Sequence, residues 1–383
     1  MSKIEELIKK LCPNGVEYKN IQELCKISRG KVMSKDFIKS NAGEYPVYSS
    51  QTENNGELGK ISTYDFDGEY LTWTTDGANA GSVFYRKGKF SVTNVCGLLE
   101  IKNKVMIPKF LYYVLSIEAP KYVNAGMGNP KLMSNVMAKI RVAVPPLEVQ
   151  CEIVHILDDF TLLSAELLAE LKARRKQYEY YKDKLFSSFI KNENIQWTTL
   201  GKYCKRLKGT AITAGKMKEI ADDNGNIKIF AGGKTMINTD ESNIPDKDII
   251  KVPNIIVQSR GIIDFIYYDK PCSFKREMWS YTTENVITLK FIYYYLKNNI
   301  EFFRQRGKQM GSMPQISLDV TEKYKIPILP IEEQEMIVKI LDKFEKLCND
   351  ISEGLPAEIE ARQKQYEYYR DKLLTFKELK VNE

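Results

Sequence analysis

The chain has 383 residues, of which 43% are hydrophobic, and its formal net charge is +7 at pH 7. This length fits two domains of about 140 residues each with helical connectors, and no apolar run is long enough to predict a membrane span. Seven cysteines without a Cys-x-x-Cys pair and a single histidine favour reduced thiols in the cytoplasm and disfavour a structural zinc site.

The first 145 residues have the pattern of a mixed α/β module. Short β-rich runs at 45–48 and 69–73 are separated by turns rich in Gly, Asn and Asp, which predicts strands. A helix is expected around 108–116, and a strand over 139–144 leads out of the module.

A long helix is predicted next, over residues 146–190. Pro146 can stand at a helix start, and no further Gly or Pro follows in this stretch. Large residues recur at steps of three and four or their sums, which is typical of a coiled-coil seam. The seam positions are Ile153, Leu157, Phe160, Leu167, Leu171, Tyr178, Tyr181 and Leu185.

The second half of the chain follows the same order. A second mixed module is predicted over 191–329, and a second helical region over 330–376 precedes a tail at 377–383. In the module, strands are expected at 227–230, 254–257, 265–268 and 325–329, with a helix at 290–298. The second seam comprises Ile337, Leu341, Phe344, Cys348, Ile351, Leu355, Ile359, Tyr366, Tyr369 and Leu373. Four extra residues around 352–356 include Gly354 and Pro356, which predicts a break and a new helix start.

An internal duplication explains this order. Residues 173–185 return as 361–373, and eleven of the thirteen positions are identical. A repeat fixes the architecture before single residues are weighed. We therefore expect an α/β (α+β) fold with two similar mixed modules, separated by two long helices that pack as an antiparallel coiled coil about a pseudo-two-fold axis. The alternative is that each helix packs only on its own module.

Basic clusters lie at turn-rich sites of both modules, whereas the helical regions balance their charges. Polar side chains and glycines in these turns suit contacts with base edges and phosphates. The candidate DNA contacts are Lys31, Ser50, Gln51, Trp73, Thr74, Asn129 and Lys131 in the first module, and Lys208, Lys234, Arg260, Arg306, Lys308 and Gln315 in the second. The alternative is that these turns are polar only because turns usually are.

No catalytic or metal-binding constellation is recognisable in the sequence. A phosphate loop ending at Lys234 would need a glycine where Lys228 stands. His155 faces Lys339 in the repeat, so we expect it on the helix surface and not at a catalytic site.

Three motifs carry a resemblance to a known family. They are Pro-Pro-Leu-Glu-x-Gln from Pro145, Ile-x-x-Ile-Leu-Asp-x-Phe from Ile153, and Lys-Gln-Tyr-Glu-Tyr-Tyr-x-Asp-Lys-Leu from Lys176. Together with the second copies they resemble the specificity (S) subunit of type I restriction-modification systems, over essentially the whole chain.

The resemblance implies two target recognition domains, 1–145 and 191–329, and two conserved helical regions, 146–190 and 330–376. Each domain would read one half of a split target on double-stranded DNA, and the helices would set the spacer and recruit two methyltransferase (M) subunits. S-adenosylmethionine would bind to the M subunits, and ATP and Mg to restriction (R) subunits that can join. This cytoplasmic chain itself would be non-catalytic, with no cofactor, metal or membrane partner.

The solvated faces of the two helical regions are candidate docking surfaces for a partner subunit. Their residues are Lys176, Tyr180, Lys184, Lys364, Tyr368 and Arg370. When isolated, the chain is a candidate homodimer. An alternative function is a non-catalytic protein-interaction scaffold with a coiled-coil dimerisation region.

Overall fold

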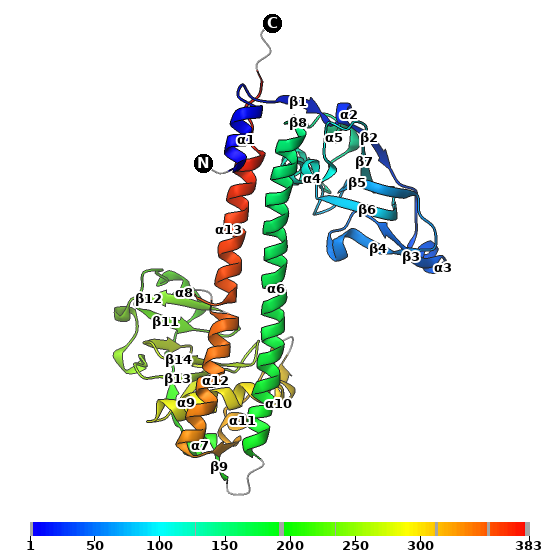
Figure 1. Cartoon of the computed structure of the whole chain (residues 1–383). Coiled ribbons are helices and arrows are strands. Elements are labelled where there is room, and N and C mark those ends of the chain that lie inside the picture. Colours follow the sequence, from blue (N-terminus) through cyan, green and yellow to red (C-terminus); the bar gives the residue numbers. More distant parts are fainter. Residues whose placement is uncertain are drawn as a thin grey trace. The chain divides into compact units, whose positions relative to one another are not determined.

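The computed structural model describes residues 3–126, 128–190, 195–233, 235–310, 313–350 and 353–379, without the side chains of 189, 190 and 308–310. It contains two compact units, Met1–Glu166 with Ile359–Glu383 (unit 1) and Leu167–Glu358 (unit 2). The long helix α6 (Leu147–Ile190) starts in unit 1 and ends in unit 2 (Figure 1). None of the described helices is long and apolar enough to cross a membrane.

Unit 1 is built on a six-stranded sheet in the order β2-β7-β5-β6-β3-β4. Its strands are antiparallel except for β3 and β6, which pair in parallel. A separate antiparallel ribbon joins β1 and β8. The strands are β1 (Glu17–Asn20), β2 (Cys25–Arg29), β3 (Ala42–Tyr48), β4 (Glu57–Ile61), β5 (Phe66–Thr74), β6 (Val83–Val92), β7 (Cys96–Ile101) and β8 (Arg141–Val144).

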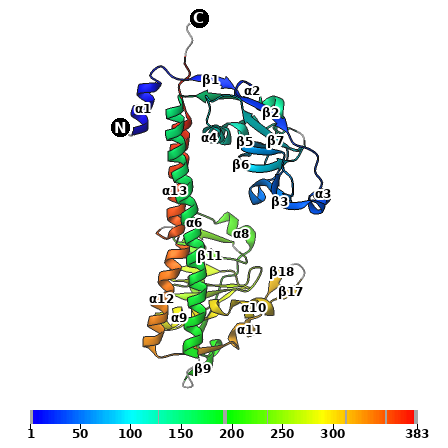
Figure 2. The ribbon, with the colours of Figure 1, turned by 45° about the vertical axis from the view of Figure 1, so that its right-hand side comes forward.

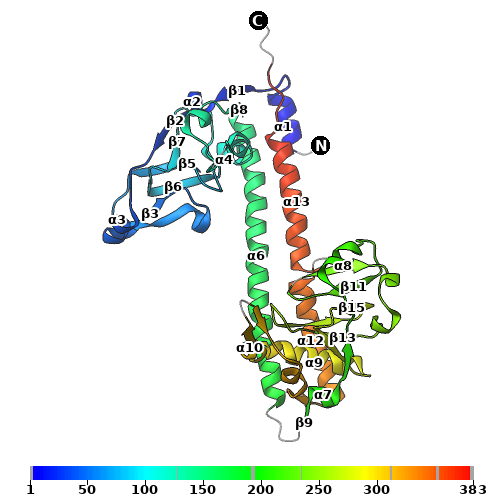
Figure 3. The ribbon, with the colours of Figure 1, turned by 180° about the vertical axis from the view of Figure 1, so that it is seen from behind.

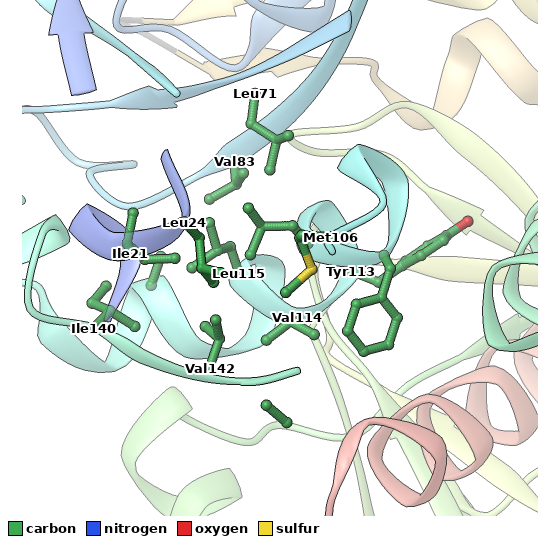
Figure 4. Close-up of a cluster of buried hydrophobic side chains, with 14 of the residues drawn as sticks. Ile21, Leu24, Leu71, Val83, Met106, Tyr113, Val114, Leu115, Ile140 and Val142 are labelled. Atoms are coloured by element: carbon green, nitrogen blue, oxygen red, sulfur yellow. The ribbon is translucent and has the colours of Figure 1, made fainter. Parts of the chain in front are cut away.

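The helices of unit 1 lie before, between and after its strands in the sequence, and α13 belongs to unit 1 from Ile359 onward. They are α1 (Lys3–Leu11), α2 (Ile21–Leu24), α3 (Lys35–Ser40), α4 (Pro108–Glu118), α5 (Ser134–Met137) and α13 (Leu355–Leu374), with the short η1 (Glu53–Gly56) and η2 (Ala119–Tyr122). Figure 4 shows the main core, where Leu71 and Val83 from the sheet meet Val114 and Leu115 from α4. Full burial of such side chains stabilises the fold by about 1.5–3 kcal/mol each.

Unit 2 repeats this plan with its sheet divided in two (Figures 2 and 3). A four-stranded sheet has the order β10-β16-β13-β14, a three-stranded sheet has the order β12-β11-β15, and β9 pairs with β19 in a ribbon. The strands are β9 (Gln196–Thr199), β10 (Lys205–Lys208), β11 (Ile227–Phe230), β12 (Met236–Thr239), β13 (Asn254–Gln258), β14 (Asp264–Tyr268), β15 (Cys272–Phe274), β16 (Trp279–Thr282), β17 (Lys308–Met310), β18 (Met313–Gln315) and β19 (Lys325–Ile328).

The helices of unit 2 also follow the order of unit 1. They are α7 (Leu200–Tyr203), α8 (Ala214–Glu219), α9 (Val286–Asn298), α10 (Ile300–Arg306), α11 (Leu318–Glu322) and α12 (Ile331–Asn349), with η3 (Glu241–Asn243) and η4 (Asp246–Asp248). All the strands and helices that we expected in the two modules are present, with ends that differ by a few residues. The fold prediction of two similar mixed α/β modules is confirmed.

The predicted break in the second helical region is also confirmed. Helix α12 ends at Asn349 and α13 begins at Leu355. Gly354 fits between them because a Cβ there would lie 2.5 Å from the backbone oxygen of Lys346.

In unit 1 the first part of α6 packs antiparallel to α13. The ring of Phe160 stacks on Tyr369 with a centroid distance of 5.7 Å. Ile156, one turn earlier, lines the same pocket as Leu373, one turn later. The two helices therefore run in opposite directions, as predicted.

In unit 2 the last part of α6 packs antiparallel to α12. The ring of Tyr181 stacks on Phe344 at 6.1 Å, and the Arg175 guanidinium donates to the Cys348 carbonyl at 3.4 Å. Every described seam residue is buried or half-buried except Tyr181 and Tyr369, which occupy matched positions. Both exposed rings stack on a phenylalanine of the facing helix, so the seam assignment holds. Ile351 lies outside the described residues.

A matched polar contact fixes each module to its long helix. In unit 1 the carboxylate of Asp158 on α6 accepts hydrogen bonds from Lys109 (2.7 Å) and Tyr113 (2.5 Å) on α4. In unit 2 the carboxylate of Asp342 on α12 accepts from Lys290 and Tyr294 on α9, both at 2.6 Å. The duplication therefore preserves the docking of module on helix as well as the helices themselves.

Residues 377–379 of the predicted tail pair with the start of the chain. The Val16 amide donates to the Lys377 carbonyl and the Leu379 amide donates to the Val16 carbonyl, both at 2.9 Å. The Tyr18 hydroxyl donates to the Phe376 carbonyl at 3.0 Å. This segment adds to the chain beside β1, a pairing between the two ends of the sequence that no local pattern reveals.

Candidate nucleic-acid interface

Two glycines at matched positions let strands approach closely in both units. A Cβ on Gly30 after β2 would lie 1.6 Å from the carbonyl oxygen of Val92, and one on Gly209 after β10 would lie 2.0 Å from that of Phe274. The next amide in each case donates to the same carbonyl, at 3.2 and 2.8 Å. In unit 1 this contact lies within the six-stranded sheet, which curls back on itself, and in unit 2 it joins the four-stranded sheet to the three-stranded one.

Three turns of unit 1 that hold candidate DNA contacts, at 50–51, 73–76 and 129–132, meet through hydrogen bonds. The Ser50 hydroxyl accepts from the Thr75 amide (3.0 Å) and donates to the Asp76 carbonyl (3.2 Å). The Leu132 amide donates to the Thr75 carbonyl at 2.9 Å, and Asp76 forms an antiparallel bridge with Lys131. We call residues 50, 75–76 and 131–132 loop cluster 1.

The corresponding turns of unit 2 meet by equivalent bonds. The Gly233 amide donates to the Arg260 carbonyl at 3.2 Å, and the Ile316 amide donates to the Ser259 carbonyl at 2.9 Å. Arg260 forms an antiparallel bridge with Gln315. We call residues 233, 259–260 and 315–316 loop cluster 2.

A buried hydroxyl anchors both loop clusters in the same way. Thr75 Oγ1 donates to the Val95 carbonyl at 2.7 Å, and Ser259 Oγ donates to the Glu277 carbonyl at 3.2 Å. Thr75 is 2% exposed and Ser259 is 4% exposed. Because these two hydroxyls form hydrogen bonds inside the protein, they fix the backbone of the loop clusters. Contacts with a ligand are left to the neighbouring side chains that reach solvent.

The side chains that stand on this shared frame differ in charge. Asp76 in loop cluster 1 corresponds to Arg260 in loop cluster 2, and Lys131 corresponds to Gln315. An acidic residue, a cation and an amide present different donors and acceptors to a base edge. The two clusters therefore have one backbone plan and two chemistries.

Unit 2 also places a charged pair beside loop cluster 2. Burial acts to raise the pKa of Glu277, but the Lys275 ammonium at 2.9 Å and the nearby Arg260 outweigh it and lower the pKa below its usual value. Glu277 therefore stays ionised at neutral pH and keeps the local charge from being wholly positive.

A buried arginine beneath the 49–57 loop of unit 1 was not foreseen from the sequence. Arg86 on β6 is 3% exposed, and its guanidinium stacks 3.5 Å from the ring centroid of Tyr48. Its Nε donates to Thr72 Oγ1 at 3.0 Å, whereas Nη1 is buried without a hydrogen-bond partner. Burial lowers the pKa of Arg86. A Cβ on Gly56 would meet its Nη2 at 2.9 Å, so the guanidinium supports this loop from below.

Two of the predicted DNA-contacting residues are buried in the structure. Trp73 is fully buried, and its Nε1 donates to the Leu132 carbonyl at 3.0 Å. Thr74 is 1% exposed and its hydroxyl accepts from the Ser82 amide at 3.0 Å. Both residues lie at the end of a core strand, where their polar groups hold the turn that follows. The polar groups alone had suggested that these residues lie at the surface.

The other candidates whose side chains the structure describes are exposed or half-buried. Lys31 has a side chain that is 74% exposed and pairs with Asp65, and Gln51 Nε2 donates to the Glu57 carbonyl at 2.6 Å. The guanidinium of Arg306, at the end of α10, stacks on Phe302 at 3.7 Å. The exposed candidates are Lys31, Asn129, Lys131, Lys208, Arg260 and Arg306, and the half-buried ones are Ser50, Gln51 and Gln315. Lys308 lies in β17, while Lys234 lies outside the described residues.

The candidate docking residues of the helices are also at the surface. Tyr180 and Tyr368 occupy matched positions and are 60% and 62% exposed. Lys176, Lys184 and Lys364 are exposed as well, and Arg370 is half-buried, pairing with Asp371 at 2.8 Å. His155 is on the helix surface as predicted, 3.1 Å from Asp159.

Comparisons with known proteins identify the family. Residues 13–174 and 192–361 match the model of the type I restriction modification DNA specificity domain. A putative type I specificity subunit of Mycoplasma pneumoniae is 35% identical over 378 residues, which cover 92% of this chain and 96% of that protein. The type I restriction enzyme MpnII specificity subunit of the same bacterium is 46% identical over 189 residues, 48% of this chain and 57% of that protein.

A solved structure shares the fold. The crystal structure of a type I restriction-modification S subunit from M. genitalium matches with a TM-score of 0.66 at 17% identity, covering 94% of this chain and 96% of that one. With two matched domains and a relative that spans nearly its whole length, the chain belongs to the family of type I restriction-modification DNA specificity subunits.

Proposed function

We propose that loop clusters 1 and 2 each read one half of a bipartite target on double-stranded DNA. The observation that carries this proposal is the shared backbone frame with different side chains, Asp76 and Lys131 on one copy and Arg260 and Gln315 on the other. One frame docks each module on DNA in the same way, and the unlike side chains give each half-site its own sequence. Exposed candidates such as Lys31 and Lys208 supply phosphate contacts.

The domain limits follow from the same proposal. The target recognition domains span 1–145 and 191–329, and the helical regions span 146–190 and 330–376, with 377–379 serving as part of the first domain. The exposed, matched Tyr180 and Tyr368 support a role of the helices in holding two methyltransferase subunits, which a repeated surface would bind alike.

Chemistry belongs to the partner subunits in this proposal. S-adenosylmethionine is held by the methyltransferase subunits, and ATP with Mg by restriction subunits, while this chain supplies recognition in the cytoplasm. A flipped adenine would react in the methyltransferase and not on this chain.

The test is selection from random DNA with the reconstituted complex of this chain and its methyltransferase subunits. We expect the recovered duplexes to share two short sequence blocks separated by a gap of constant length. Binding should also weaken steeply between about 50 and 200 mM salt, since phosphate contacts release counterions. A single continuous block, or partner binding without any DNA selection, would instead support a protein-interaction scaffold.

A further inference from the structure

The two ribbons that lead into the long helices carry a matched aromatic residue and a matched cation. Tyr18 pairs with Ala143 in the β1–β8 ribbon, and Trp197 pairs with Pro327 in the β9–β19 ribbon. Two residues before Ala143 and Pro327 along β8 and β19 stand Arg141 and Lys325. Since side chains two positions apart share one face of a strand, each aromatic ring lies on the same face as its cation.

In unit 1 a segment of the chain itself covers this face. The Tyr18 hydroxyl donates to the Phe376 carbonyl at 3.0 Å. Arg141 forms an ion pair with the carboxylate of Glu378, and its guanidinium lies 5.7 Å from the Tyr18 ring centroid. The occupant is thus an extended peptide with one acidic side chain, which adds to the backbone beside β1.

In unit 2 the corresponding face is an open groove. Its volume is about 630 Å³, and Trp197 at its edge is 44% exposed. The aromatic walls are Trp197, Tyr295, Phe302 and Tyr324. Arg306, Lys323 and Lys325 rim the groove, while Asp319 is paired with Lys323 at 2.8 Å. The groove is therefore apolar inside and cationic at its rim.

We propose that this groove binds an extended, acidic peptide segment of the methyltransferase subunit, as residues 376–378 bind the matched face of unit 1. An apolar side chain would pack between the rings, and a carboxylate would pair with Lys325 or Arg306. This inference rests on the proposed function, because it requires that the chain assembles with methyltransferase subunits. A peptide is favoured over DNA because the matched face already holds a peptide and because the walls of the groove are aromatic.

Photo-crosslinking in the assembled complex tests the proposal. Trp197 is replaced by benzoylphenylalanine in the full chain, which is then assembled with methyltransferase subunits and target DNA. The control carries the same group at Tyr203, which is 39% exposed and lies outside the groove. We expect an adduct at Trp197 with an acidic segment of the methyltransferase, located by mass spectrometry, and at least tenfold less of it in the Lys325→Glu variant.

The outcomes separate the inference from the function beneath it. An adduct with DNA, an adduct unchanged by Lys325→Glu and Arg306→Glu, or no adduct in a complex that assembles and selects DNA would overturn the groove proposal alone. A complex that assembles but selects no DNA would contradict the proposed function and remove the basis for the inference. Lys325 and Arg306 are both exposed, so their substitution should leave folding intact.

Discussion

Two glutamines at matched positions should contribute very differently to stability. The Gln150 side chain is fully buried at the start of α6 and makes three hydrogen bonds, to the carbonyls of Val105 (2.8 Å) and Pro145 (2.7 Å) and from the Ile107 amide (2.8 Å). Gln334 at the start of α12 is equally buried, but its Oε1 has no hydrogen-bond partner. Its Nε2 donates to the Leu329 carbonyl at 2.7 Å.

The magnitudes follow from these contacts. At about 1 kcal/mol net for each hydrogen bond, Gln150→Ala should cost roughly 2–4 kcal/mol, because it leaves three buried backbone groups unpaired. Gln334→Ala removes one such bond but also removes a buried unsatisfied oxygen, whose burial costs about 1–3 kcal/mol. These effects offset each other, so we expect a change within about 1 kcal/mol.

Hydrogen exchange of the full chain measures both effects separately. Ile107 precedes α4, so Gln150→Ala should lower the opening free energy of α4 amides by roughly 2–4 kcal/mol. In Gln334→Ala the opening free energy of the amides of α9, the helix that corresponds to α4, should stay within about 1 kcal/mol of its original value. Equal losses in the two variants, or a larger loss for Gln334→Ala, would refute the reasoning that hydrogen-bond satisfaction sets the cost.

Three further predictions concern unit 1. Gly30→Ala should destabilise it by at least about 2 kcal/mol in denaturant unfolding, because the new Cβ would lie 1.6 Å from the Val92 oxygen. Trp73→Phe should cost about 1–3 kcal/mol by leaving the Leu132 carbonyl unpaired, yet selection from random DNA should return unchanged sequence blocks, since the ring is buried. Burial raises the pKa of the Cys25 thiol from 9.0 to about 12, so above pH 9 the unfolded chain loses a proton that the native chain keeps. The unfolding free energy should therefore fall by about 1.4 kcal/mol per pH unit because of this thiol. The Cys25→Val variant should lack this contribution to the slope.

Controls make these outcomes decisive. In Gly215→Ala in helix α8 the new Cβ would lie 4.0 Å from the Thr213 hydroxyl oxygen, an ordinary contact that should not lower stability. Similar losses for both glycines would therefore contradict the close-approach argument. Altered base preference in Trp73→Phe would mean that Trp73 contributes to DNA recognition after all. A pH profile that Cys25→Val leaves unchanged would mean that other groups cause the alkaline loss.

The sequence was most informative about what is repeated and locally periodic. The recurrence of 173–185 at 361–373 predicted the paired helices, and Gly354 with Pro356 predicted the break between α12 and α13. Both signals depend on short-range backbone physics and helix periodicity. Gly-rich polar turns recur in both copies, and the structure brings them together in loop clusters 1 and 2.

Long-range burial was beyond the reach of the sequence. Trp73 has a polar N–H and stands beside Thr74 in a polar stretch, so only the fold shows that its bond to Leu132 is internal. Arg86 would be expected in water, and its stacking on Tyr48 follows from the curled sheet. The pairing of residues 377–379 with Val16 joins opposite ends of the chain, which no window along the sequence contains.

The central claim is that each loop cluster reads its own half of the target. Methylation-site mapping with the Arg260→Ala and Lys131→Ala variants tests it most directly, because Arg260 and Lys131 stand on loop clusters 2 and 1. Each substitution should relax base preference at one sequence block by about 1–3 kcal/mol of discrimination and leave the other block and the gap unchanged. A change in both blocks by either variant, or the same block affected by both, would contradict the account.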